Sequence, residues 1–178
     1  MKKLLAVLLA LMMVFSLTSV LAEEPEKTVI YFDDGLSFGM LFPEGYEAKS
    51  DVDKGIMTIE ITSGNLSEPN FIMIVAPDPD YDEVQRLNDL SDKEIEEFAL
   101  SMMEDLTSPS FEIRETGLGS KLIVVNEQNA EYDVVILASV YMGYLLFTYV
   151  GHADGSEVTR DDIDLGIQIY TDMDFITK

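Results

Sequence analysis

Apolar and polar positions are most clearly patterned in two apolar runs late in the chain, residues 133–141 and 144–150. Both runs are rich in Val, Ile, Leu, Tyr and Phe, and each is too short for a helix of its own, so they predict two paired β-strands. Polar residues rarely interrupt them, which is typical of central strands covered on both faces. Met142 and Gly143 separate the runs. Because Met resists a positive φ, we expect a type I turn here, followed by Gly143 in the left-handed conformation.

Shorter apolar segments predict further strands. Residues 57–62 alternate between apolar and polar side chains, as in a strand with one more polar face, whereas residues 71–75 are continuously apolar. Turn-forming residues at 33–35 and 43–45 separate the earlier segments. Besides the late pair, the pattern predicts strands at residues 28–32, 37–42, 46–50, 57–62, 71–75, 111–115 and 121–126.

Two segments carry the signals of capped helices. Ser91 and Glu94 have the spacing of a capping box, in which the serine hydroxyl accepts from the Glu94 amide and the glutamate reaches back to the Ser91 amide. The helix that they begin is expected to run to about residue 106. Thr159 and Asp162 predict a second cap, opening a helix to about residue 173. Gly166 lies inside that helix, where a glycine costs about 1 kcal/mol relative to alanine.

The order of these elements is a group of strands, a helix, four strands and a closing helix. It predicts an α+β fold, with a largely antiparallel sheet and helices packed against it. This order resembles the PsbP-like superfamily, named for an extrinsic subunit of the plant oxygen-evolving complex. The resemblance is carried by residues 41–46 (Leu-Phe-Pro-Glu-Gly-Tyr), the helix at 91–106, the hairpin at 132–151 and the closing helix running into 174–176. It implies an α/β/α sandwich and, for many members, a non-enzymatic accessory or partner-binding role. No functional residue of the family is carried over.

The first 22 residues have the pattern of an export signal. Two lysines precede an apolar run over residues 4–15, and small residues at 20–22 form a cleavage site. The alternative is an uncleaved anchor, since residues 4–22 are almost long enough to cross a bilayer. Serines and a threonine in the second half of this stretch favour the cleavable signal. We therefore expect a secreted or otherwise extracytoplasmic protein.

The rest of the chain predicts one domain. Residues 23–27 are expected to be a mobile polar leader, and residues 28–178 a single globular α+β domain with a core of its own. The chain contains no cysteine, so no disulfide supports it and its stability rests on packing.

Charge narrows the class of partner. The chain carries a net charge of −23, and removing residues 1–22, which contain two lysines and no acids, leaves −25. This charge opposes binding to nucleic acid and to anionic membrane surfaces. It favours solubility, and it favours cations or a basic protein as partners.

The candidate metal site is an acidic loop over residues 78–89. Asp78, Asp80, Asp82 and Asp89 occupy the first, third, fifth and twelfth positions of a calcium loop, where carboxylates are the ligands. Glu83, however, stands at the sixth position, which requires glycine for a sharp turn. Because acids are frequent throughout this chain, a solvated acidic loop is the favoured interpretation, and a specific cation site is the alternative. The expected cofactor is none, with Ca²⁺ as the alternative.

Three further groups of residues are candidates for a functional role. His152 lies near Asp154 and Ser156, but the sequence shows no nucleophile elbow, so a surface histidine is expected. Glu60 and Glu131 are candidates for a pair of catalytic carboxylates, but nothing in the sequence places them together, and two solvated acids at strand edges are favoured. Aromatic residues of the late hairpin fit a partner groove or ordinary packing, and packing is favoured; they are Tyr132, Tyr141, Tyr144, Phe147 and Tyr149.

The sequence thus supports three functions in order of preference. The first is a secreted, non-enzymatic accessory or partner-binding domain. The second is a calcium- or cation-binding protein that uses the loop at 78–89. The third is a carboxylate-based hydrolase.

Overall fold

The computed structural model describes residues 28–31, 36–104, 106, 108–128, 133–171 and 174–177. The export signal and the leader predicted for residues 1–27 lie outside this part of the chain. Among the described residues, no helix is long and apolar enough to cross a membrane.

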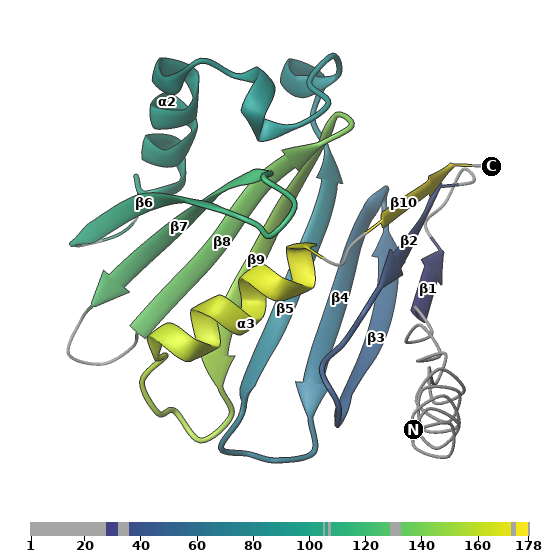
Figure 1. Ribbon diagram of the computed structural model, residues 1–178, viewed down its shortest axis with the longest axis vertical. Helices are drawn as coiled ribbons and strands as arrows, with labels where there is room; N and C mark the ends of the chain where they lie inside the picture. Colours follow the sequence, from purple (N-terminus) through teal and green to yellow (C-terminus); the bar gives the residue numbers. More distant parts are fainter. Residues whose placement is uncertain are drawn as a thin grey trace, which may run out of the picture.

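A seven-stranded sheet forms the centre of the molecule (Figure 1). Every neighbouring pair in it is antiparallel, which confirms the predicted mixed fold with a mainly antiparallel sheet. The hairpin predicted from the two late apolar runs is β8–β9, and it lies in the middle of the sheet between β5 and β7. In spatial order the strands are β3 (Tyr46–Asp53), β4 (Ile56–Ser63), β5 (Pro69–Pro77), β9 (Tyr144–His152), β8 (Asp133–Tyr141), β7 (Lys121–Gln128) and β6 (Pro109–Glu115).

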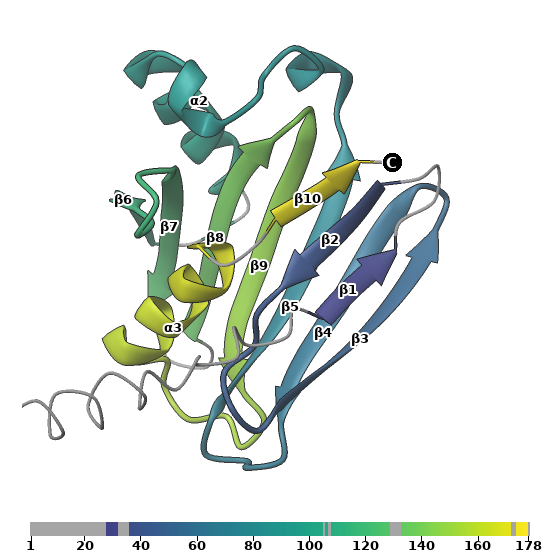
Figure 2. The same cartoon turned by 45° about the vertical axis from the view of Figure 1, so that its right-hand side comes forward.

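A second, three-stranded sheet brings the two ends of the described chain together. Its central strand β2 (Leu36–Met40) pairs with β1 (Thr28–Tyr31) on one side and with β10 (Asp174–Thr177) on the other. Figure 2 shows this small sheet in front of β3, β4 and β5. The hairpin β1–β2 was predicted, whereas β10, a strand of only four residues after the closing helix, was not.

Two α-helices begin at the predicted caps. Helix α2 (Asp92–Met102) starts after Ser91, whose hydroxyl accepts from the Glu94 amide at 3.4 Å while Glu94 accepts from the Ser91 amide at 2.8 Å. Helix α3 (Arg160–Thr171) follows the reciprocal pair of Thr159 and Asp162. Helix α2 ends about one turn earlier than predicted, while the predicted end of α3 near residue 173 lies outside the described residues. Two 3₁₀ turns, η2 (Pro79–Tyr81) and η3 (Leu87–Asp89), lie in the acidic segment between β5 and α2.

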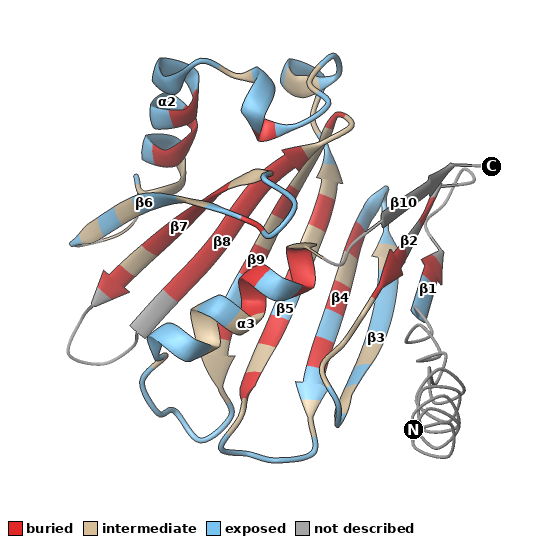
Figure 3. Ribbon diagram, viewed as in Figure 1, coloured by how far each residue is buried: buried red, intermediate tan, exposed pale blue. Residues whose placement is uncertain are grey.

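Strand β8 is buried on both faces over most of its length, as the apolarity of its residues predicts, whereas β4 and β5 keep exposed positions on the face away from α3 (Figure 3). Helix α3 and the small sheet cover one face. Helix α2 and the acidic segment cover the end of the other face over β7, β8 and β9 (Figure 1). The first face gathers Met57, Ile59, Ile61, Phe71, Met73, Leu137 and Leu146 with Ile167, Ile169 and Tyr170 of α3. The second gathers Ile123, Val125, Ile136, Ala138 and Val140 with Leu87, Ile95, Phe98 and Ala99.

The prediction of a type I turn in the β8–β9 hairpin is wrong. Tyr141 pairs with Tyr144, so the loop has only two residues, and Met142 and Gly143 both have positive φ, 50° and 81°. That is the signature of a primed turn, whose twist matches that of the strands. A hydrogen bond from outside the hairpin stabilises the unfavourable conformation of Met142: the Met142 amide donates to the carbonyl of Gln85, in the acidic segment, at 3.0 Å.

Candidate functional site

A groove opens between α2, the acidic segment and the sheet face formed by β8 and β9. It has two adjoining hollows of about 460 and 730 Å³ that share Asp80, Tyr81, Phe98 and Ser101. Volumes of this size are typical of ligand-binding clefts. We call the two hollows together the acidic groove; the first is lined in addition by Asp78, Met102, Ile136, Leu145, Phe147 and Tyr149, and the second by Pro79, Asp82, Glu83, Val84, Leu90, Glu94 and Glu97.

Aromatic rings form the floor of the acidic groove. The rings of Tyr81 and Phe98 lie 5.5 Å apart at 56°, and those of Phe98 and Phe147 lie 6.1 Å apart at 46°. Tilted pairs at these separations are favourable because the positive edge of one ring approaches the negative face of the next. The three rings come from the acidic segment, α2 and β9, so the floor joins all three elements.

The apolar floor continues onto an open part of the sheet. Tyr149 of β9 is paired with Ile72 of β5 on one side and with Ile136 of β8 on the other, so the three side chains form one row on the same face. Ile136 is buried, but Ile72 and Tyr149 are 44% and 43% exposed. Large apolar side chains that adjoin a groove and remain in contact with water are typical of interaction surfaces.

Carboxylates form the rim. Burial raises the pKa of the Tyr81 hydroxyl, and the nearby carboxylates of Asp78, Asp80 and Glu94 raise it further. The carboxylates of Asp78, Asp80 and Glu94 thus place a negative potential beside the aromatic floor. The groove is therefore apolar at its base and anionic at its edge.

The turn of the central hairpin holds the acidic segment in place. The Gly143 amide donates to the Val84 carbonyl at 3.0 Å, and the Gly143 carbonyl accepts from the Asp78 amide at 3.2 Å. A Cβ at Gly143 would lie 3.3 Å from the backbone of Asp82, so this close approach requires a residue without a side chain. The rim is thus attached to the most central hairpin of the sheet.

The four acids proposed as calcium ligands do not form one cluster. Asp78 accepts from the Asp80 amide at 2.9 Å and caps η2, while Asp89 accepts from the Arg86 amide at 3.0 Å beside η3. Asp80 and Asp82 line the acidic groove, and Asp89 lies outside its lining. Within the described ranges, no three His, Cys, Asp or Glu residues are grouped closely enough to hold a metal ion. The segment forms two separate 3₁₀ turns, η2 and η3, whereas a calcium loop wraps one continuous turn around the ion.

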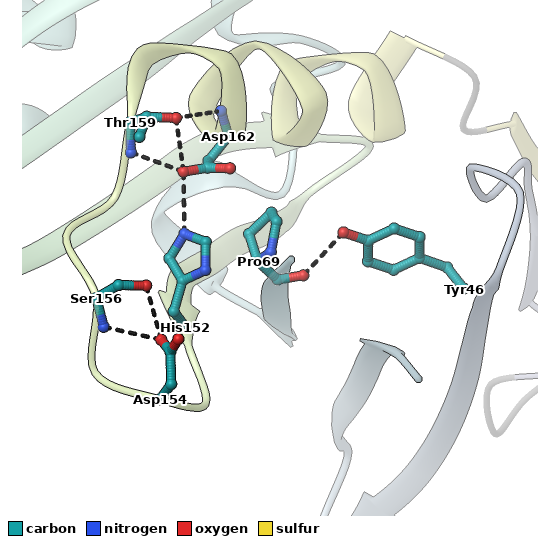
Figure 4. Close-up of polar contacts among 7 residues, drawn as sticks. All are labelled: Tyr46, Pro69, His152, Asp154, Ser156, Thr159 and Asp162. Atoms are coloured by element: carbon teal, nitrogen blue, oxygen red, sulfur yellow. Dashed lines mark hydrogen bonds and ion pairs between the residues drawn. The ribbon is translucent and has the colours of Figure 1, made fainter. Parts of the chain in front are cut away.

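The expectation of a surface histidine is wrong. The side chain of His152 is only 6% exposed, and its Nε2 lies 3.0 Å from Oδ2 of Asp162 (Figure 4). Strand β9 extends as far as His152, which places the ring beneath the first turn of α3. The sequence neighbours do not join it: the Asp154 carboxylate accepts from the amide and hydroxyl of Ser156 instead.

This histidine belongs to a capped helix end rather than to a triad. The Asp162 carboxylate also accepts from the Thr159 amide and hydroxyl, both at 2.7 Å. Burial raises the pKa of Asp162, but the hydrogen bonds from Thr159 and His152 lower it by more, so the net pKa lies below its usual value. Nδ1 of His152 has no hydrogen-bond partner among the described residues. The pair therefore fixes the start of α3 on the end of β9.

The remaining sequence candidates are two glutamates and the aromatic residues of the late hairpin. Glu60 is an exposed residue of β4, and Glu131 lies outside the described residues, so nothing here tests their pairing. Of the aromatic residues of the hairpin, Phe147 and Tyr149 line the acidic groove, whereas Tyr141 and Tyr144 pack on the other face. Tyr132 is also outside the described part. Sequence reasoning considered these aromatic residues for a groove but had no signal that brought α2 and the acidic segment against them.

Neither a scan of this chain against protein-family models nor a search of curated proteins finds a match.

Proposed function

We propose that this chain is an exported, non-enzymatic binding domain, and that the acidic groove receives a basic segment of a partner protein. The observation that carries the proposal is the combination of an aromatic floor with a rim of carboxylates. A segment with Lys or Arg side chains around one large apolar side chain matches both features.

The apolar part of the site supplies the affinity in this proposal. Interfaces are distinguished by aromatic side chains in a buried centre that is surrounded by a polar rim. Phe147 and Tyr149 take the central place here, and the exposed Ile72 extends the contact surface along β5.

The charged part supplies selectivity. Complementary charge accelerates association and rejects partners of the same sign. A chain of net charge −23 repels nucleic acid and anionic membranes. The carboxylates of the groove rim place part of this negative charge next to the apolar floor, where a partner would bind. A basic protein segment is therefore favoured over either of the other macromolecules.

The arrangement of helices supports the finer fold assignment within this proposal. Helices α2 and α3 pack on opposite faces of one sheet, as in an α/β/α sandwich of the PsbP-like type. The accessory role of many members of that superfamily agrees with a binding function, and this agreement is an analogy at the level of the fold.

The apolar floor can be tested with a fluorescent peptide that carries alternating lysines around one tryptophan. We expect saturable binding by fluorescence anisotropy, and at least tenfold weaker binding after Tyr149→Ser combined with Ile72→Ser, since central aromatic residues dominate interfaces. Leu66→Ser is the matched control, because Leu66 is 68% exposed in the β4–β5 loop away from the groove. Equal affinity in all three proteins would refute the proposed site.

The rim is tested by charge removal. Asp80→Asn combined with Asp82→Asn is expected to weaken peptide binding and to reduce its dependence on salt, because fewer carboxylates then attract the lysines. Glu157→Gln combined with Asp161→Asn removes the same net charge beside the start of α3. If both pairs of substitutions weaken binding equally, only the overall charge of the protein attracts the peptide.

The export part of the proposal has its own measurement. N-terminal sequencing of exported protein should begin near Glu23, after the small-residue site at 20–22. Recovery of chains that keep residues 1–22 in a membrane fraction would instead show an anchor.

A further inference from the structure

The outer edge of strand β6 has no partner strand in the described part of the chain. Strand β6 pairs with β7 on its inner side, and Figure 1 shows it as the last strand of the central sheet, at the end opposite β3. We propose that this edge pairs antiparallel with the same edge of a second copy of the chain, with Ile113 directly opposite Ile113 of that copy. The interface lies outside the acidic groove and does not rest on the function proposed for it.

The direction of the backbone groups of β6 follows from its hairpin with β7. The Thr116 amide donates to the Ser120 carbonyl at 2.9 Å, so these residues form a hydrogen-bonded pair at the end of the hairpin. Because hydrogen-bonded and non-hydrogen-bonded pairs alternate along an antiparallel ladder, the even-numbered residues of β6 bond to β7 and the odd-numbered residues direct their backbone groups outward. Pro109, which has no amide hydrogen, belongs to the outward set, where it costs no bond to β7. A strand added at this edge would therefore bond to odd-numbered residues centred on Ile113.

The side chains of β6 divide between the two faces of the sheet. Ile113 is paired with the buried Ile123 and lies on the face that carries α2, but it remains 42% exposed because no strand covers its outer side. Glu112 and Arg114 lie on the opposite face. The Arg114 guanidinium contacts Glu112 at 3.0 Å and Asp164 of α3 at 2.6 Å, which holds the arginine in place beside the open edge.

The sequence of β6 is complementary to itself in this register. When Ile113 is at the centre of an antiparallel pair, Glu112 of each copy lies opposite Arg114 of the other. These are non-hydrogen-bonded positions of the new ladder, where opposite side chains approach most closely and charges of opposite sign attract. The two new ion pairs extend the contact between Glu112 and Arg114 that each copy already has, so four charges of alternating sign lie in one row.

The apolar contact lies on the other face of the same interface. The Ile113 side chains of the two copies meet there, and each covers the exposed side of the other. The same patch of both copies forms the whole contact, which is the isologous arrangement of a twofold dimer. The two central sheets thereby join into one continuous antiparallel sheet.

The other edge of the central sheet is protected, whereas that of β6 is not. Strand β3 carries Glu47, Lys49, Asp51 and Asp53 on the face away from the core, and no residue of this described strand is a large apolar side chain exposed to water. Charged side chains, and lysine above all, discourage the pairing of an edge with another chain. An exposed Ile113 between two opposite charges has the contrary effect, so β6 is the edge that we assign to the dimer.

The net charge of the chain sets the conditions under which the dimer forms. Two copies of net charge −23 repel each other at long range. At physiological ionic strength the Debye length is about 8 Å, so repulsion between distant surfaces is largely screened, while charges in contact across the interface are screened less. The association is therefore measured in physiological salt.

Disulfide cross-linking tests the register. The chain contains no cysteine, so Ile113→Cys supplies its one thiol. In the proposed dimer the two Cα atoms at position 113 are about 5.5 Å apart, within the range of a disulfide. Glu115→Cys is the matched control on the same edge and face, because the two copies of position 115 are separated by four residues, about 14 Å along the strands. We expect oxidation to link Ile113→Cys at least tenfold faster than Glu115→Cys; equal rates would overturn the register.

Charge exchange, followed by sedimentation velocity over a concentration series, tests the ion pairs. We expect the unchanged protein to show a weak monomer–dimer equilibrium, as is typical of a small interface. Glu112→Arg and Arg114→Glu each place like charges opposite one another, so each should weaken the dimer at least tenfold. An equimolar mixture of these two variants restores both ion pairs and should dimerise about as well as the unchanged protein.

The control and the opposing results are equally specific. Glu47→Arg makes the same change of charge on the edge strand β3 and should not weaken the dimer. Circular dichroism verifies that the variants are folded, and the cross-linking comparison does not depend on Arg114→Glu. A protein that stays monomeric at every concentration, a dimer that neither exchange at β6 weakens, or a mixture of folded variants that does not associate would overturn the proposal.

Discussion

Gly166 provides the sharpest test of how α3 rests on the central sheet. A Cβ added there would lie 2.6 Å from Cδ1 of Leu137 and 3.2 Å from Cε1 of Phe71. Both neighbours are fully buried, so neither can move its side chain toward solvent. The glycine that looks unfavourable in the sequence is therefore the residue that allows the helix to approach β5 and β8.

Two effects of opposite sign determine the result of Gly166→Ala. Alanine gains about 1 kcal/mol over glycine as a helix former. Inserting a methyl group into a filled core costs about 1–3 kcal/mol through strained side chains and displaced backbone. Because a contact of 2.6 Å requires a real displacement of a buried leucine, we expect packing to prevail and the variant to be destabilised by about 1 kcal/mol.

Urea unfolding followed by far-ultraviolet circular dichroism measures this difference. Gln168 is exposed in the same helix. The difference in unfolding free energy between Gln168→Gly and Gln168→Ala therefore measures the helix propensity of alanine over glycine without a packing effect. In a Leu137→Ala background the closer of the two contacts is removed and only the 3.2 Å contact with Phe71 remains, so Gly166→Ala should be less destabilising there than in the otherwise unchanged protein. A stabilising effect of Gly166→Ala in the otherwise unchanged protein would refute the packing argument.

Three further predictions concern other parts of the fold. Asp162 has a lowered pKa in the folded state, so it stabilises the protein above its unfolded value of 3.8 and this contribution is lost as the pH falls through the folded value; unfolding free energies of the wild type and Asp162→Asn should therefore converge in acid. Phe147→Ala should cost about 2–3 kcal/mol in urea unfolding, less than a fully buried phenylalanine, because the ring is only partly buried; a loss below about 1 kcal/mol would contradict its place beside Phe98. Calcium in physiological salt should raise the melting temperature of the wild type and of Asp80→Asn combined with Asp82→Asn equally; a larger rise in the wild type would restore the calcium loop.

The features that the sequence predicted correctly depend on neighbours along the chain. The caps of α2 and α3 were predicted because a capping box is a pattern of residues three apart, and Ser91 with Glu94 forms it as expected. The central hairpin was predicted because two long apolar runs leave few alternatives to burial on both faces.

The features that the sequence missed depend on distant segments. His152 was assessed against Asp154 and Ser156, whereas its partner is Asp162 in the first turn of α3. Strand β10 is only four residues long, and it forms by pairing with the free edge of β2. The two strands lie near opposite ends of the described chain. The acidic groove likewise requires α2 and residues 77–90 to lie over β8 and β9, which no local pattern specifies.

The small sheet has a consequence for the order in which the protein can fold. Strand β2 finds its first partner, β1, within a few residues but its second, β10, only at the far end of the described chain. Contacts between such distant segments form slowly, because a long loop must close before they are made. A chain that emerges from its N-terminal end can complete the hairpin β1–β2 early, yet one edge of β2 stays open until the last residues arrive. During that interval β2 is a template for pairing with another chain, so a truncation before Asp174 should promote aggregation rather than simply shorten the protein.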